Sequence, residues 1–517
     1  MRILISIIFF CIFLIPSFVN LNSTHNWGSD FAQYIHQSKN IVEGLPQEKT
    51  YLYNPGFSEN GPQVYPVGFP LLLAPIYFFY GNNILIFSIF ISFCLFILNL
   101  LIFYFFKKRY GPLYAILLAI IFAYDPWMLS FKQTIVSDIP FTLFAFITMI
   151  LFFNFDETKN RPLLNKFVIL IFGSIFLAMT ILTRTIGVAF IPAMILFVIY
   201  KYKYQNTLND HTANVFYFEK FELKENLKNL FIIFLITFIL IYIVNNLIFN
   251  ITAKGNYSDQ ITFVKFKEYI YGHIFYYIEL IKFHWSKEDT WRVYPNVLRT
   301  LSMPALIIGI IVKIKEKRLH ISDFFCSIYM LILIMWPPLQ EWRFILPIAP
   351  FIYEYYFEAI KYALKFIRID FLKYTIIAIL IIFVTLTYSR SFYSKYSFKE
   401  LFSINNSIRG PNSEAATKLF DYIKKNTPED ATFVFTKPRA LALYAGRKRS
   451  MIQNVTYNIN EQEELFNKKR VCYFIEAPEL HLNNYLSYFL EKKKSEVAMI
   501  YEYEKFKLYR YEKSYCK

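Results

Sequence analysis

Long apolar segments alternate with short polar ones over the first three quarters of the chain. Residues 84–106 and 230–252 contain no Asp, Glu, Lys, Arg or His. Each is longer than the roughly 20 apolar residues with which a helix crosses a bilayer core of about 30 Å. Shorter apolar runs recur at residues 3–19, 112–124, 139–155, 186–200, 344–361 and 374–386. The pattern therefore predicts an α-helical polytopic membrane protein with about eleven transmembrane helices.

Lysine and arginine residues between the apolar runs predict how the chain is threaded. Short loops rich in these residues stay in the cytoplasm, and two such loops are residues 107–109 and 313–318. No small-residue cleavage site follows residues 3–19, so we interpret this run as an uncleaved anchor. We expect a multi-pass protein of the cell (inner or plasma) membrane. The loops expected outside are residues 21–83, 125–138 and 253–296, the last being amphipathic and rich in aromatic residues that suit the lipid interface.

The composition changes after about residue 389, where shorter apolar runs alternate with polar ones on the scale of a soluble domain. The patterns there predict helices at residues 413–425 and 439–444. They predict strands at residues 432–435, 471–475, 497–503 and 506–511. The chain is thus expected to divide into a transmembrane domain, residues 1–388, and a small extracytoplasmic α/β domain, residues 389–517. In that oxidising environment we predict a disulfide between Cys472 and Cys516.

Composition and charge narrow the class of protein. Charged residues make up 18% of the chain and hydrophobic residues 56%, and the formal net charge is +17. Such a charge can indicate nucleic-acid binding. In this chain, however, the basic residues are spread over loops between apolar runs and form no single patch. We therefore expect membrane lipid around the protein and no nucleic-acid partner.

Four ionisable residues lie at the outward ends of predicted spans or in the outer loops: Asp30, Asp138, Arg184 and Arg343. Each alone could simply mark where a span stops, but together they fit the transfer of a sugar from a lipid phosphate. Asp30 is our candidate for the base that takes the proton from the acceptor hydroxyl. Arg184 and Arg343, with Lys132 as a weaker candidate, can hold the phosphate. Asp138 can orient the partners of Asp30 or bind a divalent metal.

The motifs around these residues resemble those of a known family. Asp30, Tyr34 and Gly44 precede a proline motif, YPVGFPLLLA, at residues 65–74. Three further motifs follow in order: SDIP at residues 137–140, TRTIG at residues 183–187 and RFILP at residues 343–347. The set is similar to that of GT-C membrane glycosyltransferases of the RgtA/B/C/D-like group, which resemble dolichyl-phosphate-mannose-protein mannosyltransferases and aminoarabinose transferases. The likeness covers about residues 1–390, and residues 434–447 resemble the small outer domain of such proteins.

The resemblance implies an integral-membrane glycosyltransferase that moves a hexose or pentose from a polyprenyl-phosphate-linked sugar by inverting displacement, with Asp30 as the base. The acceptor would be an envelope lipid, glycan or protein. Tyr34, Tyr65 and His273 are expected in substrate-binding loops, although an interfacial histidine is more often a packing residue. Many relatives have an acidic residue directly after the first aspartate, where this chain has Phe31. We therefore assign no metal ligands and no certain cofactor, and a divalent metal stays open.

Two alternatives remain: a polytopic transporter or flippase for lipid or solute without transferase activity, and an assembly factor whose outer domain binds a partner. Transporters carry charged residues near the middle of the bilayer, whereas the most apolar runs of this chain have none. Glu354 and Glu358 are the exception, and we expect a structural role for them near the cytoplasmic end of their span. Asp125 precedes Pro126 and is interpreted as a turn residue and not as a second site acid.

Overall fold

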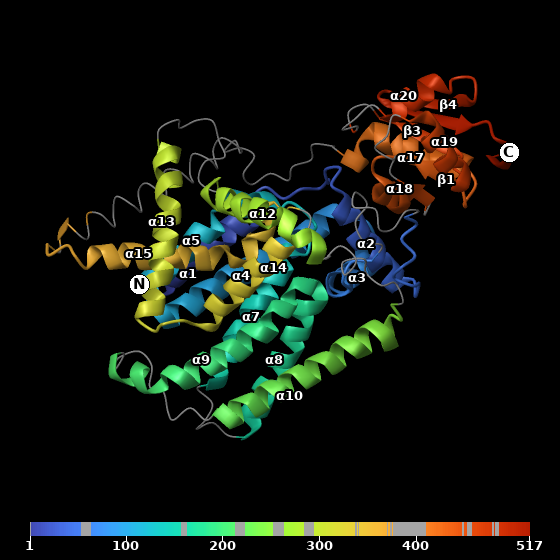
Figure 1. The fold of residues 1–517 in the computed structure, drawn as a ribbon. Helices are drawn as coiled ribbons and strands as arrows, with labels where there is room; N and C mark the ends of the chain where they lie inside the picture. Colours follow the sequence, from blue (N-terminus) through green and yellow to red (C-terminus); the bar gives the residue numbers. More distant parts are fainter. Residues whose placement is uncertain are drawn as a thin grey trace.

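A bundle of apolar helices and a small α/β domain make up the protein in the computed structural model (Figure 1). The structure describes residues 2–52, 64–156, 163–211, 223–251, 263–283, 294–336, 339, 341–369, 371–372, 375, 410–446, 449–451, 458–477, 480 and 485–516. The expected domain boundary near residue 389 lies outside the described residues, and so does the predicted last span at residues 374–386, apart from residue 375.

The helices of the bundle fall where the apolar runs predict them. Among the described residues, four are long and apolar enough to cross a membrane by length and composition: Ile84–Tyr110, Lys166–Thr183, Thr185–Tyr204 and Leu223–Ile248. The main helices are α1 (Arg2–Phe18), α4 (Ile84–Tyr110), α5 (Pro112–Ala123), α7 (Asp138–Asp156), α8 (Leu163–Thr183), α9 (Phe190–His211), α10 (Leu223–Tyr242), α12 (Phe263–Phe283), α13 (Tyr294–Lys315), α14 (Ile321–Met335) and α15 (Ala349–Leu364).

The pair α4 and α5 shows how local sequence sets the hairpins of the bundle. Asn83 caps the start of α4, because its side chain accepts hydrogen bonds from the N–H groups of Leu85 and Ile86 at 3.1 and 3.4 Å. The helix ends at Gly111, whose φ of 83° is a conformation that other residues rarely adopt. Pro112 then opens α5, where a missing N–H group costs little. The two helices therefore return side by side.

Three short helices gather at one end of the bundle, which we call the Asp30 end: α2 (Ser29–Val42), α3 (Gly68–Tyr80) and α6 (Pro126–Phe131). α2 is polar and yet buried, because the Gln37 side chain both donates to the carbonyl of Tyr65 and accepts from its N–H, each at 3.0 Å. Asp125 caps α6 by accepting from the N–H of Trp127 at 2.8 Å. The sequence placed Asp125 in a turn, and the structure shows it as the N-cap of α6.

The α12 helix lies within the aromatic loop that the sequence places at residues 253–296. One face of α12 buries Tyr277 and Ile281 against the bundle, where α12 contacts α13 and α14. The other face exposes Tyr271 and Phe275. A helix with large aromatic side chains exposed on one side is suited to the region where lipid meets water.

The α/β domain is built on a sheet with the strand order β2-β1-β3-β5-β4 among the described residues. β1 pairs in parallel with β2 and β3, and β5 pairs antiparallel with β3 and β4. Alternate strand residues face two apolar clusters, Phe433 being in one and Val434 in the other. The elements are α17 (Glu414–Asn426), β1 (Thr432–Val434), α18 (Pro438–Tyr444), β2 (Arg449–Met451), α19 (Ile459–Lys468), β3 (Tyr473–Glu476), α20 (Tyr485–Lys492), β4 (Val497–Tyr503) and β5 (Phe506–Tyr511).

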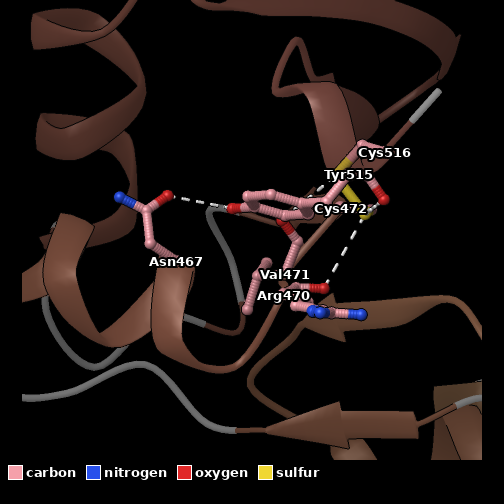
Figure 2. The surroundings of a disulfide bond; sticks show 6 residues. All are labelled: Asn467, Arg470, Val471, Cys472, Tyr515 and Cys516. Carbon is pink, nitrogen blue, oxygen red and sulfur yellow. Dashed lines mark hydrogen bonds between the residues drawn. A yellow bond between two sulfur atoms is a disulfide. The ribbon is translucent and has the colours of Figure 1, made fainter.

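A disulfide closes the end of this domain. Cys472, just before β3, is bonded to Cys516 across 44 positions of sequence, with the two Cα atoms 5.3 Å apart (Figure 2). Tyr515, beside it, donates to the side chain of Asn467 in α19 at 3.0 Å. The predicted disulfide is therefore confirmed, and it ties the last residues of the described chain to the centre of the sheet.

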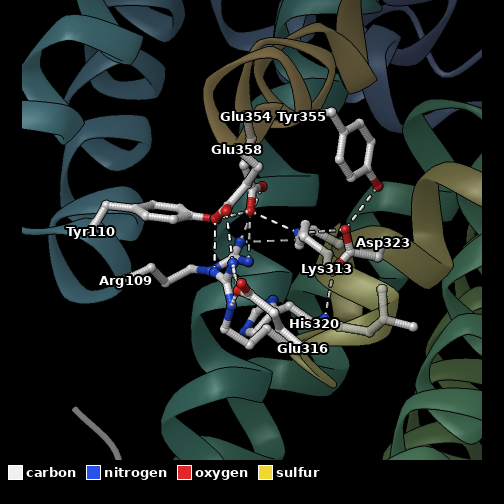
Figure 3. Close-up of polar contacts among 12 residues, drawn as sticks. Arg109, Tyr110, Lys313, Glu316, His320, Asp323, Glu354, Tyr355 and Glu358 are labelled. Carbon is white, nitrogen blue, oxygen red and sulfur yellow. Dashed lines mark hydrogen bonds and ion pairs between the residues drawn. The ribbon is translucent and has the colours of Figure 1, made fainter. Parts of the chain in front are cut away.

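A buried ionic network joins helices at the end of α4 that is far from α3 (Figure 3). Glu354 of α15 accepts hydrogen bonds from Arg109 of α4 at 3.2 Å and from Lys313 of α13 at 2.8 Å. One turn further along α15, Glu358 accepts two hydrogen bonds from Arg318, at 2.8 and 2.7 Å. These pairs confirm the structural role that the sequence suggests for Glu354 and Glu358.

Candidate active site

Asp30 lies in the first turn of α2, where the positive end of the helix dipole favours a negative charge. Its carboxylate is about a quarter exposed, at 26%. One oxygen, Oδ1, accepts a hydrogen bond from the hydroxyl of Tyr65 at 2.7 Å, and the other, Oδ2, accepts from Nη1 of Arg343 at 2.7 Å. The side chain is thus fixed in direction while it remains accessible.

Arg343 connects Asp30 to a second carboxylate. It lies in η3 (Trp342–Phe344), and its Nε donates to Oδ2 of Asp138 at 2.9 Å. Asp138 is fully buried at the start of α7, and its Oδ1 accepts from Nη1 of Arg184. Arg184 follows the end of α8 and lies over the ring of Phe344 at 4.2 Å. The structure therefore brings the four residues singled out in the sequence into one chain of ion pairs, which we call the ion-pair chain.

The two tyrosines expected in substrate loops also lie in this site. The rings of Tyr34 and Tyr65 stack with their centroids 4.7 Å apart. The hydroxyl of Tyr34 is 3.0 Å from Oγ of Ser137, the residue before Asp138. The first outer loop and the start of α7 are thereby joined beside the carboxylate of Asp30.

Lys132 and His273 have other surroundings. The ammonium group of Lys132 donates to the backbone carbonyls of Ser17, at 3.4 Å, and Val19, and so covers the carbonyl end of α1. Burial lowers the pKa of Lys132 to about 7. Nδ1 of His273 lies 3.1 Å from the carbonyl oxygen of Ile334 at the end of α14. A role of either residue in binding substrate stays a prediction.

Arg439 is a residue of the site that the sequence did not single out. It belongs to α18 of the α/β domain, and its Nη1 donates to Oδ1 of Asp30 at 3.1 Å and to the hydroxyl of Tyr65 at 2.8 Å. A stretch around Arg439 resembles the outer domain of the related family, but nothing in the sequence indicates a contact across 409 positions. Only the folded arrangement of the two domains reveals it.

Comparisons with known proteins agree with this architecture. Residues 2–251 match the family model of dolichyl-phosphate-mannose-protein mannosyltransferase. The oligosaccharyltransferase AglB from Archaeoglobus fulgidus, solved with an inhibitory peptide and a dolichol-phosphate, is similar at a TM-score of 0.58 and 10% identity, over 93% of this chain and 70% of that one. ArnT from Cupriavidus metallidurans, bound to undecaprenyl phosphate, is similar at a TM-score of 0.55 and 10% identity, over 100% and 99% of the two chains. The chain has the GT-C fold. No curated protein sequence matches it.

The GT-C fold extends over the whole chain, α/β domain included, because the similarity to ArnT covers both chains almost completely. A mostly helical membrane domain with a small C-terminal sheet was expected from the sequence, and it is confirmed. Polytopic membrane location follows from the same fold and from the apolar helices.

The charges around Asp30 decide its protonation. Burial on its own would raise the pKa of the Asp30 carboxyl, but the charges of Arg343 and Arg439 and the hydrogen bond from Tyr65 outweigh burial. The pKa of Asp30 is therefore held below its ordinary value. Asp30 is a carboxylate throughout the physiological range of pH.

A divalent metal fits these residues poorly. Both oxygens of Asp30 accept hydrogen bonds, and both oxygens of Asp138 face an arginine. Among the described residues, no group of three or more His, Cys, Asp or Glu side chains could hold a metal ion. The arrangement is that of carboxylates held by guanidinium groups, which suits the binding of a phosphate better than of a cation.

Proposed function

We propose that this protein transfers a monosaccharide from a polyprenyl-phosphate-linked donor to the hydroxyl of a lipid, glycan or protein on the outer side of the membrane. The observation that carries the proposal is the ion-pair chain, in which Asp30 and Asp138 share Arg343 at one end of a GT-C bundle. The similarity to proteins solved with dolichol-phosphate and undecaprenyl phosphate supports a lipid-phosphate donor.

In the proposed reaction, the oxygen of the acceptor hydroxyl attacks the anomeric carbon of the sugar. The bond from that carbon to the phosphate oxygen breaks on the opposite side, so that the configuration inverts. Asp30 takes the proton of the acceptor hydroxyl. Arg343 and Arg184 stabilise the negative charge on the departing lipid phosphate, and Asp138 holds both guanidinium groups in place.

The outer side is proposed for the Asp30 end for two reasons. The basic residues Lys107, Lys108 and Arg109 form the last turn of α4, at the other end of that helix, and such clusters are retained in the cytoplasm. The α/β domain, which contacts Asp30, contains the disulfide between Cys472 and Cys516, and such bonds persist in oxidising compartments.

The replacement Asp30→Asn tests the assignment of the base. This variant keeps the size of the side chain but cannot take a proton, so we expect the transfer rate to fall at least about 100-fold. Binding of undecaprenyl phosphate should persist, because the arginines remain. Transfer is measured by mass spectrometry of surface glycans and lipids in a deletion strain that carries each variant, and binding is measured on the purified protein.

Glu43→Gln is the matched control. Glu43 follows the end of the same α2 helix, is exposed, and lies with Oε1 3.8 Å from Nζ of Lys39. Removing its charge should leave transfer unchanged. Full transfer by the Asp30→Asn variant would rule out Asp30 as the base. If deletion of the gene alters no surface sugar, the proposal that the protein is a glycosyltransferase is wrong.

A further inference from the structure

The α/β domain is fixed against the first outer loop by apolar contacts. Trp27, three residues before Asp30, lies among the rings of Phe420, Phe435 and Phe506, with centroid distances of 6.3, 6.1 and 6.1 Å. In return, Leu443 of α18 is buried in the hydrophobic core of the helix bundle. Figure 1 shows α18 beside α2. The two domains therefore share a packed interface, and α18 has a defined position over the Asp30 end.

The backbones of the two domains are in close contact at a second point. At Gly410, which precedes α17, an added Cβ would lie 2.1 Å from the carbonyl oxygen of His25. The φ of Gly410 is +66°, so glycine is favoured at this point for its conformation as well as its size. Contacts of this kind leave little freedom for the domain to shift. The position of α18, and with it the position of its side chains, is therefore fixed relative to the first outer loop.

The packing of the α/β domain against the first outer loop places the side chain of Arg439 in the site. Its side chain is only 5% exposed, and its guanidinium group lies over the ring of Tyr65 at 5.0 Å from the centroid. With Nη1 bonded to Asp30 and to Tyr65, the guanidinium group lies on one oxygen of Asp30 while Arg343 lies on the other. Two arginines from different domains thus flank the same accessible carboxylate.

Guanidinium groups outnumber carboxylates among the described residues that these ion pairs join. Two carboxylates, Asp30 and Asp138, are joined to three guanidinium groups, those of Arg184, Arg343 and Arg439. A sugar linked through a lipid phosphate is a singly charged phosphodiester. When the sugar leaves, the lipid phosphate becomes a monoester, which carries a charge of roughly −1.5 to −2 at pH 7. The third arginine therefore supplies the positive charge that the departing phosphate needs.

We propose that Arg439 is a ligand of the donor phosphate, so that the phosphate site is completed by the α/β domain. This inference rests on the proposed function and extends it to a residue outside the membrane domain. When the phosphate binds, Arg439 and Arg343 turn their N–H groups from Asp30 towards it. Asp30 then loses partners that stabilise its negative charge, and it becomes a stronger base at the moment when the donor is present.

The test measures the dissociation constant of the full-length protein for undecaprenyl phosphate in detergent. Arg439→Gln should weaken binding about 10- to 100-fold, the range that corresponds to the loss of a charge-assisted hydrogen bond. Arg439→Lys keeps the charge but loses the planar fork, so it should weaken binding less. Arg510→Gln, at an exposed arginine on β5 of the same domain, should leave binding unchanged.

A double replacement separates a phosphate ligand from a residue that only positions Asp30. If Arg439 binds phosphate, Arg439→Gln weakens binding both in the wild-type protein and in the Asp30→Asn background. An effect that appears only when Asp30 is intact would overturn the inference, as would unchanged binding in both backgrounds. If the wild-type protein binds no polyprenyl phosphate, the proposed function fails and this inference fails with it. If Arg439→Gln does not fold, the same comparison is made with Arg439→Lys.

Discussion

Asp30, the proposed general base, combines two properties that oppose each other in that role. It is accessible and well oriented, and yet its partners lower its pKa and so weaken it as a base. A group whose pKa is lower in the folded state stabilises that state above its unfolded pKa of about 3.9, and this contribution is lost as the pH falls through the folded pKa. Between pH 5 and 8, therefore, neither the stability nor the activity should change through protonation of Asp30.

This argument predicts the pH profile of kcat/KM for transfer. In the wild-type protein, no loss of activity from Asp30 should occur above about pH 4. In Arg343→Gln, which lacks the largest of the charges that lower the pKa of Asp30, the acid limb should move to higher pH. A limb from Lys132, whose pKa is about 7, or from His25, whose pKa burial lowers to about 4, would be common to both proteins.

Identical acid limbs in the two proteins would contradict the prediction. They would mean that the charge of Arg343 does not act on the group that titrates. The profile should be recorded at constant ionic strength, because screening by salt weakens interactions between partly exposed charges.

The residues of the ion-pair chain could be found in the sequence because each interrupts or ends an apolar run, where a charged side chain is costly unless it has a purpose. Which of these residues pair with one another could not be predicted from the sequence. That Arg343 bridges Asp30 and Asp138, with 205 positions between Arg343 and Asp138, depends on how the helices pack. Arg439 left no such signal, since an arginine in a soluble domain is ordinary.

At the scale of elements, two glycines set how closely helices approach around Arg184. A Cβ added at Gly68, the first residue of α3, would lie 2.7 Å from the backbone carbon of Leu182 in α8. A Cβ added at Gly187 would lie 2.9 Å from the carbonyl oxygen of Thr180. Both glycines belong to the motifs seen in the sequence, and both pack against the segment that ends in Arg184. The two motifs therefore determine how closely the backbones pack, in addition to supplying charged residues of the site.

Gly68→Ala should consequently force α3 away from α8. The atoms that a methyl group would meet belong to the backbone, so we expect a destabilisation of about 1–3 kcal/mol and weaker binding of undecaprenyl phosphate through a displaced Arg184. Thermal unfolding in detergent and the dissociation constant measure the two effects.

Gly173→Ala is the control for this replacement. Gly173 lies in α8 as well, but a Cβ there would meet nothing within 4 Å. Alanine favours a helix by roughly 1 kcal/mol over glycine, so this variant should be as stable as the wild-type protein or more so. If both variants behaved alike, the close approach at Gly68 would have no consequence for the fold.

The apolar helices were predictable because hydrophobic length alone identifies them. In the α/β domain, β4 and β5 have the predicted bounds. β2 was missed because it contains only Arg449, Ser450 and Met451, too few residues for a period to show. α19 and α20 were missed because they span only 10 and 8 residues, so that each shows the helical period over fewer than three turns.

At the scale of the whole molecule, the protein holds buried charge at two separate places. The ion-pair chain at the Asp30 end includes a carboxylate that is accessible. The network around Glu354 is closed: the side chains of Glu354 and Lys313 are fully buried and that of Arg109 is 8% exposed. The ion-pair chain is suited to a site whose charged groups can exchange one hydrogen-bond partner for another. The network around Glu354 is suited to a permanent connection between α4, α13 and α15.

Glu354→Gln should therefore destabilise the whole bundle. It leaves Arg109 and Lys313 buried with less compensating charge, which typically costs about 3–5 kcal/mol. The fraction that stays folded should bind undecaprenyl phosphate as the wild-type protein does, because the site lies elsewhere. Glu316→Gln is the control, since Glu316 is one-third exposed and its partners Lys365 and Arg318 are 54% and 25% exposed, and it should cost at most about 1 kcal/mol. Equal losses of thermal stability would argue against the closed network as a joint.

The contact between Asp30 and Arg439 also has a consequence for biosynthesis. The two residues are 409 positions apart, so a ribosome that adds roughly 5–20 residues per second needs roughly 20–80 s to pass from one to the other. Throughout that interval the nascent first loop carries its carboxylate without this arginine. A chain interrupted before α18 would lack Arg439 and therefore this contact with Asp30.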